Sequence, residues 1–132
     1  MHTINVKTNS RFDIIDITKE VRRCVLEEKT ESGIAVIFTP HTTAGVGINE
    51  NADSNVLFDM KNAFNKVVAQ HDNYRHAEGN SQAHVLSSLV SPSLTVIIEN
   101  KDIVLGVWQD IYFFEFDGAR NRKVYVQVMK NK

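Results

Sequence analysis

Residues 94–129 read LTVIIENKDIVLGVWQDIYFFEFDGARNRKVYVQVM, and this stretch indicates the class of fold. Apolar, aromatic and β-branched residues gather in it as short runs of the kind that form strands: Leu94–Ile98, Ile103–Leu105, Trp108–Phe116 and Val124–Met129. The dipeptide Asp117-Gly118 lies between the last two runs and is typical of a hairpin. Because strands follow one another here without helices between them, the pattern predicts an α+β fold with mostly antiparallel sheets rather than a doubly wound sheet.

The residues before this stretch predict further strands and about three helices. Ile4–Thr8 and Phe12–Ile17 are read as the two strands of a hairpin, and Ile34–Thr39 as a strand that is covered on both faces. Helices are expected from a Thr18 N-cap to about Lys29, from an Asp53 or Ser54 N-cap through Val68, and from Ser81 through Leu89. The chain, residues 1–132, is expected to form one compact domain.

The composition excludes several classes of protein. The 15 Lys and Arg against 16 Asp and Glu give a net charge of −1, so no basic field exists to attract nucleic acid or an anionic membrane. No apolar stretch approaches the roughly 20 residues of a membrane span, and polar residues interrupt the N-terminus where a signal peptide would be apolar. The single Cys24 rules out an internal disulfide and fits a reducing compartment. We therefore expect a soluble cytoplasmic protein with no nucleic-acid or membrane partner.

Histidines concentrate in residues 70–84, QHDNYRHAEGNSQAH, which contain His71, His76 and His84. Another histidine, His41, opens a second polar and glycine-containing loop at residues 41–50. Imidazole binds divalent metals and moves protons near neutral pH, so we expect His41, His76 and His84 to converge on one site. Their spacing matches no standard zinc motif. His84 falls in the first turn of the third expected helix, where the helix dipole favours a neutral ring, so it should matter more than His71.

Polar residues near the histidines supply candidate ligands and bases, each with an alternative structural role. Glu50 could be a metal ligand or a base, whereas Asp53 could equally cap a helix. The loop that contains Thr42 is rich in donors and could hold a phosphate through backbone N–H groups. Arg120 and Arg122 are expected at the tip of a basic hairpin, where they would be merely solvated or would clamp a phosphate or carboxylate.

The predicted strands carry more apolar surface than one chain can easily cover. Val124, Val126 and Val128 lie on one face of the last strand, while Tyr125 and Met129 lie on the other. Together with residues 108–116, this exceeds the area that three short helices would bury, which predicts apolar subunit interfaces. Trp108 is read as a core or subunit-interface anchor.

Several motifs together resemble the small YjbQ-type proteins, which are often described as secondary thiamine-phosphate synthases. These motifs are His41-Thr-Thr-Ala-Gly-Val-Gly-Ile-Asn-Glu-Asn51, Asn73-Tyr-Arg-His-Ala-Glu-Gly-Asn-Ser81 with Ala83-His84, Leu105-Gly106, Trp108-Gln109, and Glu115-Phe-Asp-Gly118 with Arg120-Asn-Arg122. They span nearly the whole chain. One departure is Ser91-Pro92, which follows the third helix where such proteins usually have glycine.

The resemblance implies a compact α+β fold that assembles as a homotrimer, with the histidine loops near the subunit boundaries. It also implies that His41, His76 and His84 occupy the family's histidine positions, with Glu50, Asp53, Glu78 and Asn80 beside them. On this basis we expect a thiamine-phosphate synthase-like enzyme that joins a pyrimidine diphosphate to a thiazole phosphate. The three histidines would hold a divalent ion, zinc or magnesium.

Roles follow for the remaining polar residues. The candidate catalytic residues are His84, Glu50, Glu78 and Asp53, and the candidates for binding the phosphorylated substrate are Thr42, Thr43, Asn49, Asn80, Arg120 and Arg122. Two alternatives stay open. The chain could be a metal-dependent hydrolase of a small phosphorylated substrate, with Glu50 or Glu78 activating water. It could also be a trimeric module that binds a small anion or a metal without catalysis.

Overall fold

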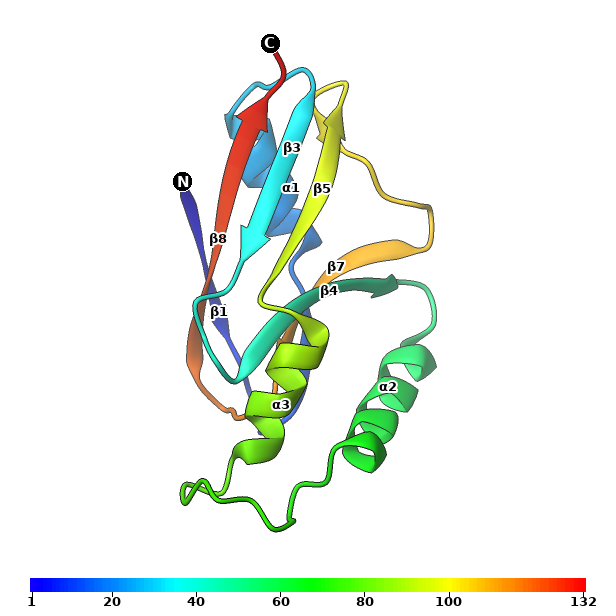
Figure 1. The fold of residues 1–132 in the computed structure, drawn as a ribbon. Helices are drawn as coiled ribbons and strands as arrows, with labels where there is room; N and C mark the ends of the chain where they lie inside the picture. Colours follow the sequence, from blue (N-terminus) through cyan, green and yellow to red (C-terminus); the bar gives the residue numbers. More distant parts are fainter.

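The computed structural model describes residues 1–132 and confirms an α+β fold with antiparallel sheets and three helices (Figure 1). The strands are β1 (His2–Lys7), β2 (Asp13–Asp16), β3 (Gly33–Phe38), β4 (Ala44–Glu50), β5 (Ser93–Glu99), β6 (Asp102–Ile103), β7 (Gln109–Glu115) and β8 (Asn121–Lys130). The helices are α1 (Thr18–Glu27), α2 (Ser54–Val67) and α3 (Ser81–Val90). None of the helices combines the length and the hydrophobicity that crossing a membrane requires.

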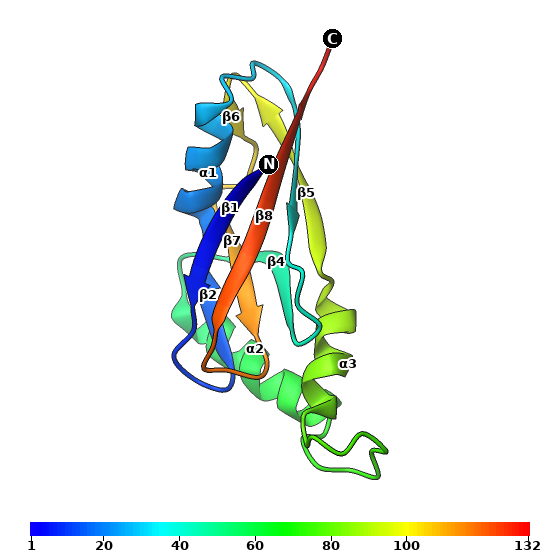
Figure 2. The same ribbon diagram turned by 90° about the vertical axis from the view of Figure 1, so that its left-hand side faces the viewer.

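The strands form a five-stranded sheet in the order β1-β8-β3-β5-β6 and a three-stranded sheet in the order β2-β7-β4. The larger core lies between the inner face of the five-stranded sheet, α1 and one face of the three-stranded sheet (Figure 2). A second core lies between the other face of the small sheet and helices α2 and α3. Along β7, Ile111 and Phe113 point into the first core, while Tyr112 and Phe114 point into the second. Strand β7 is therefore the shared wall of both cores.

Both expected hairpins are wrong, although the strands themselves exist. Strand β1 pairs with β8 and β2 pairs with β7, so the chain changes sheets between Lys7 and Asp13. In the same way β7 and β8 belong to different sheets, and Asp117-Gly118 lies in a crossing between the sheets. Alternating hydrophobicity identifies a strand, but it carries no information about which strand pairs with it.

The expected glycine loop after His41 is also wrong, because its residues from Ala44 onward form strand β4. A Cβ atom on Gly47 would lie only 3.0 Å from the ring of Phe114 in the neighbouring strand. A Cβ atom on Gly45 would lie 3.0 Å from a methyl carbon of Val90 in α3. The glycines therefore allow close packing beneath the second core, and do not form a flexible phosphate loop.

Two helix starts differ from the expected caps. The Thr18 hydroxyl does not cap α1: it is buried and accepts the backbone N–H of Ile111 at 2.8 Å. The Asp16 carboxylate instead accepts the backbone N–H of Thr18 at 2.9 Å. Helix α3 begins one residue earlier than a Ser81 cap would require, with Asn80 in the N-cap position. Both changes arise because tertiary hydrogen bonds compete with the local capping bonds that the sequence pattern indicates.

The backbone at the end of α3 explains why glycine is usual at this position, where this chain has Ser91. Ser91 has a φ of 99°, a conformation that glycine adopts without steric cost and that other residues adopt rarely. The Ser91 hydroxyl compensates locally, because it donates to the carbonyl of Ser93 at 2.9 Å. Strand β5 then begins directly after Pro92, in register with β3.

A buried ion pair joins the two sheets. Arg122 was expected at an exposed tip, but it is only 5% exposed and donates through Nε and a terminal nitrogen to both carboxylate oxygens of Glu115, which is fully buried. The Thr8 hydroxyl donates to the same carboxylate at 2.8 Å, and the Asp117 N–H donates to it at 3.0 Å. Arg122 also donates to the Thr43 hydroxyl at 2.8 Å. These contacts connect β7, β8, the end of β1 and the turn before β4.

Loss of the buried arginine should destabilise the fold strongly. Arg122→Ala would leave the Glu115 carboxylate buried without its cation, which typically costs about 3–5 kcal/mol. Arg120→Ala is the matched control, since Arg120 forms a half-exposed ion pair with Asp117 and such pairs contribute about 0–1 kcal/mol. Urea unfolding of both variants at one protein concentration measures the difference. Equal losses of stability from the two substitutions would contradict this account of the ion pair.

Candidate functional site

His84 and His76 lie together at the start of α3. Their rings are 5.3 Å apart between centroids and meet edge to face, with an interplanar angle of 74°. They line a surface hollow of about 420 Å³. The other residues of its lining are Tyr74, Arg75, Ser81 and Val85. His84 is half-buried, whereas His76 belongs to an almost wholly exposed loop.

His84 also lines a second hollow, and this one contains His41. The second hollow has a volume of about 360 Å³ and is formed by His41, Thr42, His84, Ser87, Ser88 and Pro92. The structure therefore brings His84 beside each of the other two expected histidines. We call these two adjoining hollows, with His41, His76 and His84, the histidine surface. His71, at the far end of the loop, lines neither hollow.

The fold fixes the two walls of the histidine surface. Helix α3 buries Ala83 and Leu86 against the small sheet, and the Ser87 hydroxyl donates to the carbonyl of Ala44 at 2.6 Å. This leaves the neighbouring face of α3, with His84, toward solvent. His41 follows β3 and is held from the other side, because its Nε2 accepts the backbone N–H of Lys123 at 3.0 Å.

The surroundings of His41 lower its pKa below the ordinary value of 6.5. Partial burial is the main cause, since it disfavours the charged ring. The guanidinium of Arg122 lowers the pKa further, while Glu115 opposes it. Arg120 and Lys123 add smaller effects in the same direction as Arg122. His41 is therefore a neutral imidazole near neutral pH.

The donor set of one chain does not fit the expected divalent ion. Nowhere in the chain do three or more histidine, cysteine, aspartate or glutamate side chains group in a way that could hold a metal ion. His76 and His84 adjoin, but the Nε2 lone pair of His41 is engaged by a backbone N–H. A metal on the three histidines thus stays a prediction that needs ligands from outside one chain and a released His41.

Two of the three expected catalytic carboxylates, Glu50 and Asp53, lie away from the histidines within one chain. Strand β4 runs from the α3 side toward the start of α2 (Figure 1). Glu50 ends this strand and so lies roughly 20 Å from Ala44, at about 3.3 Å per residue. Asp53 is the N-cap of α2, and its carboxylate accepts the Asn55 N–H at 2.9 Å. Asn49, next to Glu50, is exposed at the same end, and its side chain accepts the Glu50 N–H. Glu78 alone is close in sequence to His76, and it is exposed.

The expected phosphate-binding residues divide into engaged and free side chains. Thr43 and Arg122 are buried and bonded to each other, so neither presents a free group to a substrate. Asn80 donates to Asp117 at 3.0 Å, and its other side-chain atom, Oδ1, is buried without a partner. Arg120 pairs with Asp117 but remains half-exposed. Thr42 is exposed and belongs to the histidine surface.

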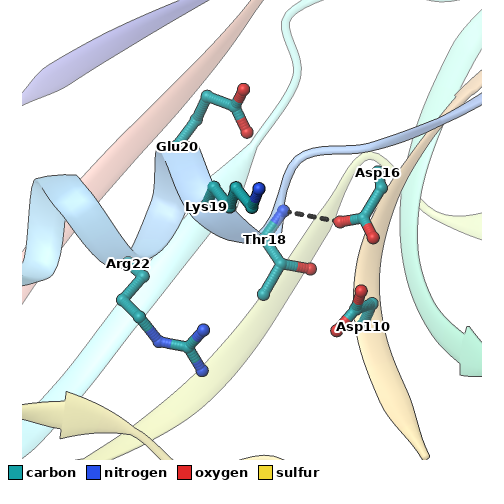
Figure 3. A pocket seen from close by; sticks show the side chains of 6 residues that line it. All are labelled: Asp16, Thr18, Lys19, Glu20, Arg22 and Asp110. Atoms are coloured by element: carbon teal, nitrogen blue, oxygen red, sulfur yellow. Dashed lines mark hydrogen bonds between the residues drawn. The ribbon is translucent and has the colours of Figure 1, made fainter. Parts of the chain in front are cut away.

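A further hollow was not predicted from the sequence. It has a volume of about 360 Å³ and is lined by Asp16, Thr18, Lys19, Glu20, Arg22 and Asp110 (Figure 3). A hydrogen bond shared with Asp16 raises the pKa of Asp110, and partial burial adds to this effect. Asp16 and Asp110 come from opposite parts of the chain and meet only because β2 pairs with β7. No local motif could have revealed the pair.

Stability should fall at acidic pH through His41. Because the folded chain depresses the pKa of His41, the unfolded chain binds a proton below about pH 6.5 that the folded chain does not. The free energy of unfolding must then decrease as pH falls through this range. His41→Gln keeps an acceptor for the Lys123 N–H but cannot titrate, so its stability should decrease less between about pH 7 and about pH 5. Urea unfolding across that range checks this, and parallel curves for both proteins would contradict it.

Comparison with known proteins defines the class. The family model described as UPF0047 protein YjbQ-like matches residues 2–131. The UPF0047 protein YugU of Bacillus subtilis is 48% identical over 130 residues, covering 98% of each chain. A UPF0047 protein of Methanocaldococcus jannaschii is 47% identical over 127 residues, which cover 96% of this chain and 92% of the relative.

Solved structures agree with the sequence comparison. The crystal structure of a YjbQ/UPF0047 family protein from Clostridium acetobutylicum has a TM-score of 0.96 and 46% identity, covering 98% of this chain and all of that one. A YbjQ-like protein of unknown function from Sulfolobus solfataricus has a TM-score of 0.95 at 26% identity, covering 98% of this chain and 96% of that one. The α+β chain described here is thus one of a class of small proteins that share this architecture. It belongs to the YjbQ/UPF0047 family.

Proposed function

We propose that this protein is an enzyme that transfers or joins small phosphorylated molecules at the histidine surface. The observation that carries the proposal is the position of His84, which lines two adjoining hollows and meets a different histidine in each. An imidazole held in the first turn of a helix has a fixed direction, and its ring N–H can donate a hydrogen bond to a reacting group. Two hollows that share one such group suit a reaction between two substrates.

The reaction that fits this arrangement best is the one the family resemblance suggests. In thiamine-phosphate synthesis the thiazole nitrogen forms a bond to the pyrimidine methylene carbon, and the bond from that carbon to the diphosphate oxygen breaks. The diphosphate leaves with the bonding electrons. The hollows of about 420 and 360 Å³ lie within the size range of small-molecule sites. Each could take one substrate, which would hold the reacting atoms together across His84.

A metal-dependent hydrolase is less well supported. That reaction needs a coordinated ion with an open position for water, commonly on three protein ligands. One chain offers the adjoining pair His76 and His84 but no third ligand beside them. We therefore favour the two-substrate reaction, in which a ring N–H of His84 donates a hydrogen bond to the departing diphosphate and His76 supports its ring.

We also propose that the protein assembles as a homotrimer through the outer face of the five-stranded sheet. This face carries exposed apolar side chains in adjacent strands: Ile34 and Phe38 of β3, Ile97 of β5 and Met129 of β8. Ile34 lies opposite both Ile97 and Met129 in the register, so these side chains form one patch. A second exposed group, Val104, Val107 and Trp108, lies in the β6–β7 loop. A neighbouring subunit would cover such surface and could bring the Glu50 end of its own β4 toward the histidine surface.

His84 should be required for turnover. With both substrates and magnesium present, the wild-type protein should release diphosphate, and omission of either substrate should abolish the release. His84→Ala should lower kcat/KM by about 10²–10³, as expected for loss of a donor that stabilises the charge developing on the leaving diphosphate. His71→Ala is the matched control, because His71 lines neither hollow, and it should retain most activity. Diphosphate release that is independent of the second substrate, or equal losses in the two variants, would sink this assignment.

The trimer is tested by the mass in solution. Light scattering should return three times the chain mass of 15.0 kDa. Ile97→Glu puts a charge in the apolar patch and should shift the mass toward that of the monomer. Val67→Glu, at a residue of α2 that is 74% exposed, should leave the mass unchanged. A wild-type mass equal to one chain at micromolar concentration would exclude this assembly.

A further inference from the structure

The hydrogen bond to His41 determines which of its ring nitrogens carries the proton. A ring nitrogen that accepts a hydrogen bond must be unprotonated, and Nε2 accepts the Lys123 N–H at 3.0 Å. The neutral ring then carries its proton on Nδ1, where it acts as a donor. Neither nitrogen remains free to coordinate a metal: the Nε2 lone pair is engaged, and Nδ1 has no lone pair in this tautomer.

We propose that the hollow formed by His41, Thr42 and Ser88 is a phosphate subsite, in which His41 donates through Nδ1–H and is not a metal ligand. This inference rests on the proposed function, since it names the group of the phosphorylated substrate that this part of the histidine surface binds. His41 would then be a hydrogen-bond donor in place of the expected metal ligand. His76 and His84 would contact the reacting end of the substrate.

The hollow offers further donors beside His41. The hydroxyls of Thr42 and Ser88 are exposed in its lining and make no hydrogen bond within the chain. Ser87, by contrast, already donates to the carbonyl of Ala44 and is not available. A phosphate group carries three acceptor oxygens on one tetrahedral centre, so it can accept from several converging donors at once. A metal would need lone pairs instead, and beside these hydroxyl oxygens only the ring of His84 remains in the lining to supply one.

The charge around the hollow favours an anion. Arg122, Arg120 and Lys123 all act on His41 from the β8 side. Arg122 is neutralised by Glu115, and Arg120 is partly neutralised by Asp117. Lys123 is exposed and forms no ion pair, and its uncompensated charge also acts on His41. The same field that disfavours a protonated or metal-bound imidazole therefore attracts a phosphate.

Nitrogen-15 NMR of the wild-type histidines tests the tautomer directly. We expect the His41 signals of a neutral ring protonated at Nδ1, with Nε2 unprotonated. Titration with inorganic phosphate should shift the His41 Nδ1–H signal, whereas titration with zinc alone should leave the His41 signals in place. A ring protonated at Nε2, or His41 signals that respond to zinc and not to phosphate, would overturn the proposal.

Two substitutions separate the functions of the two ring nitrogens. The amide nitrogen of His41→Asn reaches the position of Nδ1 and keeps the donor, whereas His41→Gln keeps an acceptor near the position of Nε2 and loses the donor. Phosphate affinity, measured by calorimetry, should fall about tenfold or more in His41→Gln, because hydrogen bonds to a charged group are the stronger ones. It should change less than about threefold in His41→Asn. Equal losses in the two variants would overturn the donor role.

The outcomes also separate this inference from the proposed function. Phosphate binding that depends on the Nδ1 donor, without any turnover of paired substrates, supports the subsite and rejects the two-substrate enzyme. Turnover that depends on His84, with phosphate affinity unchanged in His41→Gln, supports the enzyme and rejects the subsite.

Discussion

The buried ion pair between Glu115 and Arg122 is the interaction on which the rest of the structure depends. It lies at the end of β7 in the small sheet and near the start of β8 in the large one. It therefore joins two sheets whose strands do not pair with each other. The carboxylate is satisfied by four donors, which is the condition under which a buried charge is tolerable. Thr43 adds the turn before β4 to the same cluster.

This arrangement also builds one side of the histidine surface. Arg122 and Thr43 bring the start of β8 against the turn that follows β3, and the next residue, Lys123, then presents its N–H to His41. The other side depends on α3. Its Ser87 hydroxyl donates to the carbonyl of Ala44, the residue that follows Thr43. His41 and His84 therefore face one hollow because a single short segment, residues 41–44, is bound from both sides. A buried arginine thus helps to determine the shape of the site.

The sequence predicted most elements, because they depend on local signals. Hydrophobic patterning predicted every strand except β4, whose glycines were read as a loop, and the Asp53 cap with an apolar stripe predicted α2. Strand pairing was not predictable in this way, because β1 pairs with β8, which lies more than a hundred residues further along the sequence. The candidate histidines were identified from their polar context, but the tautomer of His41 depends on a backbone group of β8. Arg122 was taken for a surface residue because nothing near it in sequence indicates a buried partner. The Asp16 and Asp110 pair was missed for the same reason.

The central claim is that the histidine surface is where this protein meets its substrate. A crystal structure of the protein grown with a phosphorylated pyrimidine or thiazole compound tests it most directly, through difference density calculated without any ligand. We expect the phosphate to lie in the hollow beside His41 and the organic part to contact His84. Density in the hollow of Asp16 and Asp110, with the histidine surface empty, would contradict it.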